Sequence, residues 1–335
     1  MAALKPSRTE LPLQYFLENE YQSLIEIFHW VANLAGSVYT DTTCVVPPEA
    51  AYSSVLVSRT HQLSQEFLLN FKRSSLDLGL PLGISGYFGF PARSSLALRQ
   101  LSEQEDHDNP EQVIKLPPYQ NVNASLGVTI RARRSLRQFS GKTMPLQALS
   151  TILFYGNGVT GDMAMISEED DPQWPQYSLG APEVAHTRAA SSGGGLNPIS
   201  LYLVLQNVET LEDGIYIYLP FEHSLKKVMT FNQQKRKEHL ALGLSWGTNV
   251  EAAKVNLAIY YVYTVYENSR KYGDMGLIFA VLEAGEIAAN IHLVCTATKL
   301  ASSDMGGWDK VQTERFLGID GLSKQLVHTT VIGMP

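Results

Sequence analysis

The chain has 335 residues, of which 44% are hydrophobic and 18% are charged, a composition typical of a globular protein with a sizeable core. Its formal net charge of -7 argues against non-specific nucleic-acid binding, because a protein that neutralises many phosphates usually presents a basic surface. The two cysteines, Cys44 and Cys295, have no CxxC partner, which argues against a disulfide framework and a cysteine-based zinc site.

The first 21 residues mix charged and apolar side chains and lack the uninterrupted apolar core of a signal peptide. No stretch of the sequence reaches the roughly 18 consecutive apolar residues that would suggest a membrane span. We therefore expect a cytoplasmic protein that is neither exported nor bound to a membrane.

The N-terminal third contains two helical patterns, over residues 13–34 and 55–71, in which apolar residues recur at three- and four-residue spacing. An acidic and polar segment, 102–119, ends in LPPY and is interpreted as a linker. The sequence thus predicts a largely helical N-terminal region, residues 1–118, whose role it does not reveal. The main domain is predicted to span 119–335.

In the main domain, helical spacing predicts helices over 146–155 and 276–300. Strands are predicted where Val, Ile, Leu and Tyr gather between turn residues, at 201–206, 215–219, 255–265 and 326–332. Strands and helices do not alternate in a steady βαβ order. We therefore predict an α+β fold and not a doubly wound parallel sheet.

The helix predicted over 276–300 carries apolar residues at helical spacing, which we expect to form one buried face. Glu283 and Glu286 interrupt its apolar sequence and argue against a membrane span. The expected face consists of Leu277, Ala280, Val281, Ala284, Ile287, Ala288, Ile291 and Cys295.

Three glycines, Gly156, Gly158 and Gly161, satisfy the G-x-G-x-x-G pattern of dinucleotide-binding folds. In those folds the pattern leaves a strand and opens a helix, so that a pyrophosphate lies on the helix N-terminus. Here it follows a predicted helix and is expected to enter a polar loop. We therefore interpret it as a glycine-rich helix end.

Four arginines and a serine crowd the letters RARRSLR, where a helix-like segment is predicted to start. Guanidinium groups form paired, charge-assisted hydrogen bonds to phosphate oxygens, so the cluster suits a phosphate monoester. A solvated basic patch is the alternative. The residues are Arg131, Arg133, Arg134, Ser135 and Arg137.

Two glycine-rich segments could lie against a flat ligand, since glycine lets the backbone approach closely and adopt positive φ angles. The first, SSGGG, comprises Ser191, Ser192 and the glycines 193–195, and precedes a predicted strand. The second, Gly306 and Gly307 in DMGGWD, follows the long helix. Flexible turns are the alternative for both.

Lys271 and Tyr272 stand between a predicted strand and the long helix, where we expect a loop. An amine beside a phenol can transfer protons if burial or neighbouring charge moves a pKa toward neutrality. An ordinary solvated surface pair is the alternative. The eight histidines are scattered, with no HExxH motif, so no metal site is expected.

Taken in order, these motifs resemble the nitroreductase-like FMN superfamily, and within it the SagB/McbC-type azoline dehydrogenases. The resemblance covers about residues 125–335. RRSLRQFSGKTMPLQALSTILFYGNGVTG is similar to the family's opening RRS-x-R-x-F segment and the helix after it. SSGGGLNP is similar to the family's P-S-A-G-G-L-Y-P run, and RKYGDMG is similar to its K-Y-G-D-R-G pattern.

This resemblance implies an FMN-binding fold with a central, mainly antiparallel sheet flanked by helices. It implies Lys271 and Tyr272 as the catalytic pair of azoline oxidases, and a homodimer with flavin at the interface. The FMN-binding residues that it implies are Arg133, Arg134, Ser135, Arg137, Ser191, Ser192, Gly193, Gly194, Asn290, Gly306 and Gly307.

Three positions depart from the family pattern, namely Asn197 for an aromatic residue, Met275 for an arginine and Glu286 for a histidine. The predicted activity is the oxidation of thiazoline or oxazoline rings in a ribosomal peptide or carrier-bound intermediate. A cyclodehydratase is the expected protein partner. The alternatives are an NAD(P)H-dependent nitro or quinone reductase and a non-catalytic docking subunit of a peptide-modifying complex.

Overall fold

A computed structural model describes residues 112–164, 184–241 and 250–335 of the chain. The helices predicted over 13–34 and 55–71 lie outside these residues. The same is true of most of the predicted N-terminal region.

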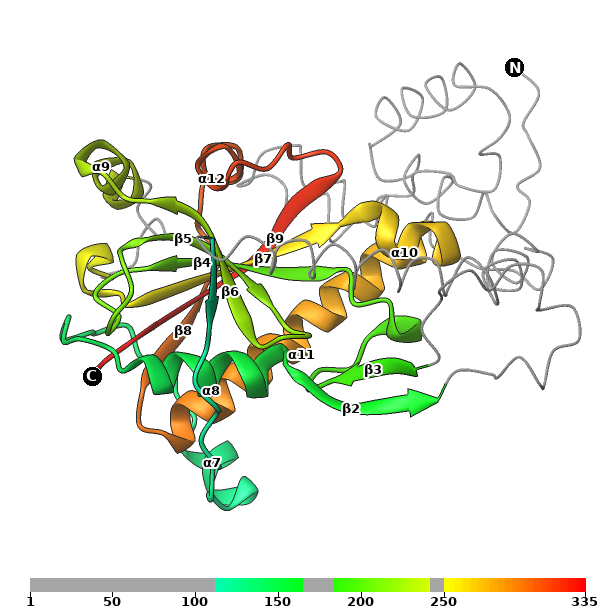
Figure 1. The fold of residues 1–335 in the computed structure, drawn as a ribbon, viewed down its shortest axis with the longest axis horizontal. Coiled ribbons are helices and arrows are strands. Elements are labelled where there is room, and N and C mark those ends of the chain that lie inside the picture. Colours follow the sequence, from blue (N-terminus) through cyan, green and yellow to red (C-terminus); the bar gives the residue numbers. More distant parts are fainter. Residues whose placement is uncertain (1–111, 165–183, 242–249) are drawn as a thin grey trace, which may run out of the picture. The chain divides into compact units, whose positions relative to one another are not determined.

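The centre of the described structure is a seven-stranded sheet in which every neighbouring pair is antiparallel (Figure 1). The strand order is β1-β6-β5-β4-β7-β9-β8. This arrangement confirms the predicted α+β fold with a mainly antiparallel sheet. The strands are β1 (Val113–Lys115), β4 (Ile199–Leu205), β5 (Gly214–Leu219), β6 (Ser224–Thr230), β7 (Leu257–Thr264), β8 (Ala301–Met305) and β9 (Lys324–Gly333).

A separate hairpin, β2 (Val159–Ala164) with β3 (Val184–Arg188), completes the strands of the described residues. The helices are α7 (Leu126–Ala132), α8 (Leu146–Asn157), α9 (Gln233–Ala241), α10 (Val265–Tyr272), α11 (Met275–Ala297) and α12 (Lys310–Leu317). All four predicted strands, and the predicted helices at 146–155 and 276–300, are confirmed to within a few residues.

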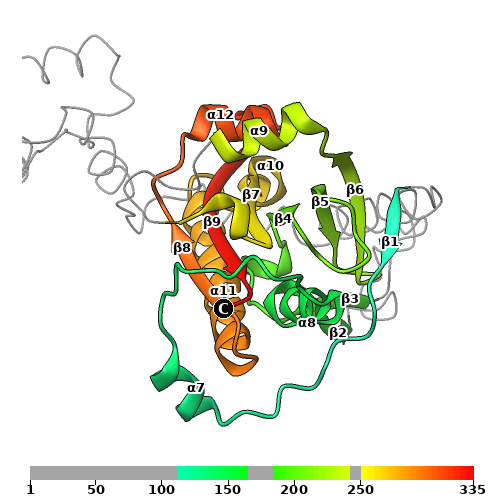
Figure 2. The same cartoon turned by 90° about the vertical axis from the view of Figure 1, so that its left-hand side faces the viewer.

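Both faces of the sheet are covered by helices (Figure 2). Along β4, Leu201 and Leu203 belong to the apolar cluster formed with α8 and α11, whereas Tyr202 and Val204 belong to the cluster that contains Phe316 of α12. Since successive strand residues point to opposite faces, a strand covered on both sides has to be apolar throughout. This explains the uninterrupted apolar run Leu201–Leu205 (LYLVL) in β4.

Helix α11 packs on the sheet, on α8 and on α10. Most of its predicted apolar face is buried, but Leu277 and Val281 are 38% and 52% exposed, so the prediction is wrong for these two residues. They lie on the same side of the helix as the buried Ala284 and Ala288, but in its first two turns, where this side is exposed among the described residues. By length and composition α11 could cross a membrane, yet core helices pass the same test, and its buried side packs in the core.

The G-x-G-x-x-G segment lies at the end of α8. The helix ends at Asn157 and β2 begins at Val159, so a strand follows directly and the predicted polar loop is wrong at this point. A helix that precedes a strand is the reverse of a dinucleotide-binding unit. A Cβ at Gly156 would lie 2.7 Å from Ile291 Cγ1, so this glycine serves the packing of α8 on α11.

The end of the predicted linker 102–119 is part of the sheet. Val113–Lys115 pairs with β6, and Leu116 is buried. The Ser150 hydroxyl donates a hydrogen bond of 2.5 Å to the Pro117 carbonyl, which fixes the LPPY stretch on α8. The linker interpretation is therefore wrong for these residues, because β6 offers an edge that accepts them. The domain boundary at 118 stays a prediction.

His239 of α9 is fully buried beside Phe231 and Phe316, and its Nε2 accepts a hydrogen bond from Gln206 Nε2. Burial lowers its pKa from 6.5 to about 4, with a further lowering by Arg236 that Asp213 opposes. The fold therefore favours neutral His239. Its stabilising contribution is complete above about pH 6.5 and is lost as the pH falls toward 4.

We expect the free energy of unfolding to fall by about 3 kcal/mol through this group between about pH 7 and pH 4, at 1.36 kcal/mol per pKa unit. A His239→Gln variant should show a flatter pH dependence over this range, measured by urea denaturation. The control is His186→Gln, at a half-exposed position on β3. Equal slopes for wild type and His239→Gln would contradict the assignment.

Candidate active site

Lys271 and Tyr272 form the last turn of α10, so the predicted loop is wrong at this position. The turn is fixed by Asn268, a buried residue whose Oδ1 accepts a hydrogen bond from Tyr263 Oη at 2.8 Å. Its Nδ2 donates to the Gly276 carbonyl at 2.7 Å. One amide thus ties together β7, α10 and α11, and sets the position of the pair.

The structure brings this pair to the SSGGG segment. Gly194 has a φ of +64°, and a Cβ on it would lie 2.6 Å from Lys271 Nζ and closer still to Tyr272 Oη. Positive φ and close contact both require glycine here. Two motifs that are 77 positions apart, Gly194 and Lys271, therefore meet in space.

Phe279 of α11 completes this corner. A Cβ on Gly193 would lie 3.1 Å from Phe279 Cδ2, and the rings of Tyr272 and Phe279 meet edge to face with centroids 4.9 Å apart. The sequence analysis missed Phe279, because an aromatic residue in a long apolar helix is indistinguishable from a core residue by periodicity. Its position next to the Lys–Tyr pair became visible only in the fold.

Lys271 is a buried lysine. The residue is 7% exposed, and its Nζ lies 5.1 Å from the centre of the Tyr272 ring. Burial lowers the pKa of Lys271, because desolvation disfavours the charged ammonium. A lowered pKa increases the fraction of neutral amine, the form that can accept a proton from a substrate.

The serines of the SSGGG segment hold its backbone in place. Ser192 Oγ accepts a hydrogen bond from the Asn197 amide at 2.8 Å, and Ser191 Oγ donates to the carboxylate of Glu286. Asn197, a departure from the family pattern, adopts a φ of +46°, which asparagine tolerates better than most residues. The loop therefore has a defined conformation and is not merely a flexible turn.

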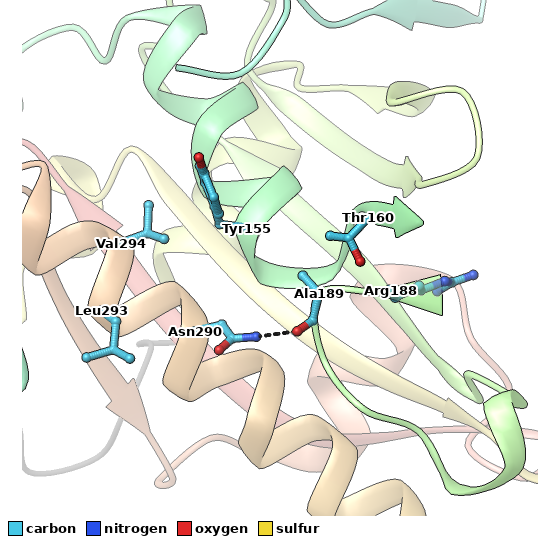
Figure 3. Close-up of a pocket in the computed structure, with 7 residues that line it drawn as sticks. All are labelled: Tyr155, Thr160, Arg188, Ala189, Asn290, Leu293 and Val294. Atoms are coloured by element: carbon cyan, nitrogen blue, oxygen red, sulfur yellow. Dashed lines mark hydrogen bonds between the residues drawn. The ribbon is translucent and has the colours of Figure 1, made fainter. Parts of the chain in front are cut away.

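Asn290 of α11 lines a cavity of about 350 Å³ beside this loop (Figure 3). Its Nδ2 donates a hydrogen bond to the Ala189 carbonyl at 3.1 Å, so the amide holds the chain just before the SSGGG segment. The other residues that line the cavity are Tyr155, Thr160, Arg188, Ala189, Leu293 and Val294.

The arginine cluster lies at the end of a helix and not at the start of one, since Arg131 belongs to the last turn of α7 and the backbone after Ala132 is irregular. The amide of Leu136 donates to the Ser302 carbonyl at 2.9 Å, which places the segment beside the edge strand β8. Arg134 Nη1 donates to the carbonyls of Arg131 and Arg133, both at 2.8 Å. No carboxylate of the described residues pairs with the arginines of the RARRSLR segment.

Gly306 and Gly307 follow the strand β8 and not, as expected, the long helix. The strand β8 was not predicted. Just before them, the Asp304 carboxylate accepts hydrogen bonds from His292 Nε2 at 2.9 Å and His328 Nε2 at 3.0 Å. Burial opposes the ionisation of Asp304, but these bonds outweigh it and hold its pKa well below the usual range. No spacing in the sequence indicates this cluster.

The predicted FMN-binding residues form two groups in one chain. The SSGGG group meets α11 at Phe279 and Glu286, whereas the arginine group meets β8 at Ser302, whose hydroxyl bonds to His292 near the other end of α11. Within the described residues no hydrogen bond or ion pair joins the two groups.

The residues present nevertheless fit FMN in their chemistry. Several guanidinium groups with no carboxylate partner in the described chain suit a phosphate. A Cβ at Gly306 would meet no described atom within 4 Å, so packing within the described chain does not account for glycine at this position.

Comparisons with known proteins show the family to which the chain belongs. A protein-family model described as "Nitroreductase family" matches residues 130–334, which is more than half of the chain. The chain belongs to the nitroreductase family. It is thus a nitroreductase-family oxidoreductase, and the predicted resemblance is confirmed at this level.

Among individual proteins, the chain is 25% identical over 195 residues to "Putative nitroreductase MJ1384" of Methanocaldococcus jannaschii, covering 58% of the chain and 84% of the relative. The crystal structure of a putative nitroreductase from Ralstonia eutropha JMP134 has a TM-score of 0.49 at 22% identity. The match covers 67% of this chain and 89% of that one. The E. coli microcin synthetase McbBCD complex with truncated pro-MccB17 bound has a TM-score of 0.47 at 18% identity, covering 90% and 98%. No functional conclusion follows from structural similarities of this size.

The contact between Gly194 and the Lys–Tyr pair can be tested with two alanine variants. Gly194→Ala and Gly195→Ala both place a Cβ at positive φ, which costs about 1–2 kcal/mol. Only Gly194→Ala also forces a Cβ against the ends of the Lys271 and Tyr272 side chains, which adds about 1 kcal/mol, the low end for overpacking, because flexible side-chain ends give way more easily than backbone. Urea denaturation should therefore show Gly194→Ala as the less stable variant, and equal stabilities would contradict the described packing.

Proposed function

We propose that this protein is an FMN-dependent dehydrogenase that oxidises thiazoline or oxazoline rings to thiazoles or oxazoles, in a ribosomal peptide or a carrier-bound intermediate. Family membership supports the flavin oxidoreductase part of this proposal. One observation supports the azoline part, namely that Lys271 and Tyr272 are held together against Gly194. This pair matches the Lys–Tyr pair of the SagB/McbC-type dehydrogenases that the sequence resembles.

The FMN phosphate would be held by the guanidinium groups of the RARRSLR segment and the hydroxyl of Ser135, through charge-assisted hydrogen bonds. The loops at Ser191–Gly194 and Gly306–Gly307 would lie along the flavin, because neither glycine pair carries a side chain in the way. When bound, FMN supplies a hydride acceptor.

The chain's own contribution is proton transfer. Aromatisation of an azoline removes a proton from the carbon beside the imine and carbonyl, together with a hydride from the neighbouring ring carbon. Lys271 Nζ is suited to take the proton, because burial favours its neutral amine. Tyr272 Oη lies within the same corner and would orient the amine or relay the proton. Oxygen is the proposed final acceptor of the two electrons.

We also propose a homodimer with the flavin at the interface. This proposal is supported by the separation of the arginine group from the SSGGG group within one chain. A second copy would place its arginine group beside the SSGGG group of the first. Exposed apolar side chains next to the arginines, Leu126, Val128 and Ile130 of α7, are between 55% and 65% exposed and would suit a covered surface. The proposed substrate comes from a cyclodehydratase, the class of enzyme that forms azolines, which makes it the expected partner. The cytoplasmic location stays a prediction.

The name of the Methanocaldococcus relative favours one rival, an NAD(P)H-dependent nitro or quinone reductase. In that case NADPH should bleach the bound flavin rapidly while azoline peptides remain unchanged. A docking subunit would capture a cyclodehydratase without any dehydrogenase activity in the assembled complex. Each outcome would replace azoline oxidation as the function.

To test the proposal, the FMN-loaded protein is incubated in air with an azoline-bearing peptide, and the loss of two hydrogens is followed by mass spectrometry. Lys271→Ala and Tyr272→Phe should stay yellow but react at least about a hundredfold more slowly, as expected for loss of a general base. Tyr266→Phe, an exposed position on the same helix, is the control. Wild-type rates in both pair variants would disprove the assigned role.

FMN retention tests the arginine group separately. Arg133→Gln and Arg137→Gln should each weaken FMN binding by about 10- to 100-fold, because a hydrogen bond between charged groups contributes about 1.5–3 kcal/mol. Flavin fluorescence titration measures the dissociation constant. Arg315→Gln, at an exposed arginine of α12, should retain wild-type affinity. If all three variants bind FMN equally, the phosphate lies elsewhere.

A further inference from the structure

We infer that Glu286 is a positioning residue, which fixes the SSGGG loop in the conformation that encloses Lys271 and Tyr272. This inference rests on the proposed function for its catalytic meaning, but its structural part stands on the contacts of α11. The loop connects β3 to β4, which belong to different sheets, so neither sheet alone defines its path.

Three polar residues of α11 bind the backbone on either side of the loop. Glu283, Glu286 and Asn290 are spaced three and four residues apart, which puts them on one side of the helix. Asn290 Nδ2 donates to the Ala189 carbonyl at 3.1 Å, and Glu283 Oε1 accepts from the Ile199 amide at 3.2 Å. These two contacts hold the ends of the loop.

Glu286 holds the middle of this series. Its Oε2 accepts the backbone amide of Ser191 at 3.0 Å and also the Ser191 hydroxyl. Two donors on one carboxylate oxygen define the direction in which the chain leaves residue 191.

Two glycines connect the contact at Glu286 with the Lys–Tyr pair. Gly193 lies against Phe279 and Gly194 against Lys271 and Tyr272, so a shift of the chain after Ser191 would open the cover over the Lys271 amine. Within the loop, Ser192 Oγ and the Ser192 carbonyl bind the Asn197 and Gly195 amides. Because these internal bonds hold the segment together as one unit, its position depends on the external contact with Glu286.

The experiment compares Glu286→Ala, which removes both contacts, with Glu286→Gln, whose amide oxygen can still accept them. Glu238→Ala, at a half-buried glutamate of α9 that contacts Lys235 and not the SSGGG loop, is the control. Amide hydrogen exchange over residues 189–198 should be about tenfold faster in Glu286→Ala, which corresponds to about 1.4 kcal/mol. Acetylation of Lys271 by acetic anhydride, followed by mass spectrometry, should accelerate in parallel, while exchange in α8 and β4 stays unchanged.

With azoline peptide and FMN-loaded protein, Glu286→Ala should lose about tenfold in kcat with little change in KM, since a misplaced catalytic group lowers the rate and not the affinity. Glu286→Gln should recover most of the loop protection and most of the rate. Unchanged exchange and acetylation in Glu286→Ala would overturn the inference. A loosened loop with a wild-type kcat would overturn the catalytic meaning of the contact.

Failure of the proposed function can be distinguished from failure of this inference about Glu286. If wild-type protein does not oxidise azolines, but the loop and Lys271 respond to Glu286→Ala as expected, then azoline oxidation is wrong and the positioning of Lys271 by Glu286 is supported. If wild-type protein is active and neither reporter responds, the proposed function stands and the inference is wrong.

Discussion

The packing of α11 is the constraint on which the rest of the site depends. One side of this helix supplies small and branched apolar residues, such as Ala280, Ala284 and Ile287, to the core beneath the sheet. The adjoining side carries the polar groups that hold the segment between β3 and β4. A single rigid helix thereby relates the sheet, the SSGGG loop and the Lys–Tyr pair, and the position of each follows from its contact with α11.

The chemistry of the pair follows from this packing. Lys271 follows the helical turn that Asn268 fixes, and the glycine loop covers its amine without adding a side chain. Removal from water lowers the pKa of Lys271, so the contacts that order the corner also support its proposed role as a base. Packing and proton chemistry are linked at Gly194, where a methyl group would displace the ends of the Lys271 and Tyr272 side chains.

Charge is distributed in a way that composition conceals. The chain as a whole is acidic, yet the arginines after α7 have no carboxylate partner in the described residues, which leaves a local cation-rich surface for an anion. This surface lies beside β8, whereas the SSGGG loop meets α11. The proposed homodimer would bring both groups to one cofactor, which would explain why they are separate in one chain.

Periodicity located the elements that are long and covered by the core. The helices at 146–155 and 276–300 and the four predicted strands are recovered, because burial on a defined face or on both faces imposes a clear apolar pattern. The short edge strands β1 and β8, and β6 with its polar half, were missed. Edge strands gain only one neighbour and bury less surface, so their sequences carry a weaker pattern.

The sequence by itself determined which residue types are present and in which order, and that order identified the family and the Lys–Tyr, arginine and glycine motifs. Only the tertiary structure decided which of them meet. It joined Lys271 and Tyr272 to Gly194, added Phe279 and Glu286, and left the arginine segment beside β8. The physical reason is that proximity between distant segments depends on how the helix packs on the sheet, and local spacing does not encode that packing.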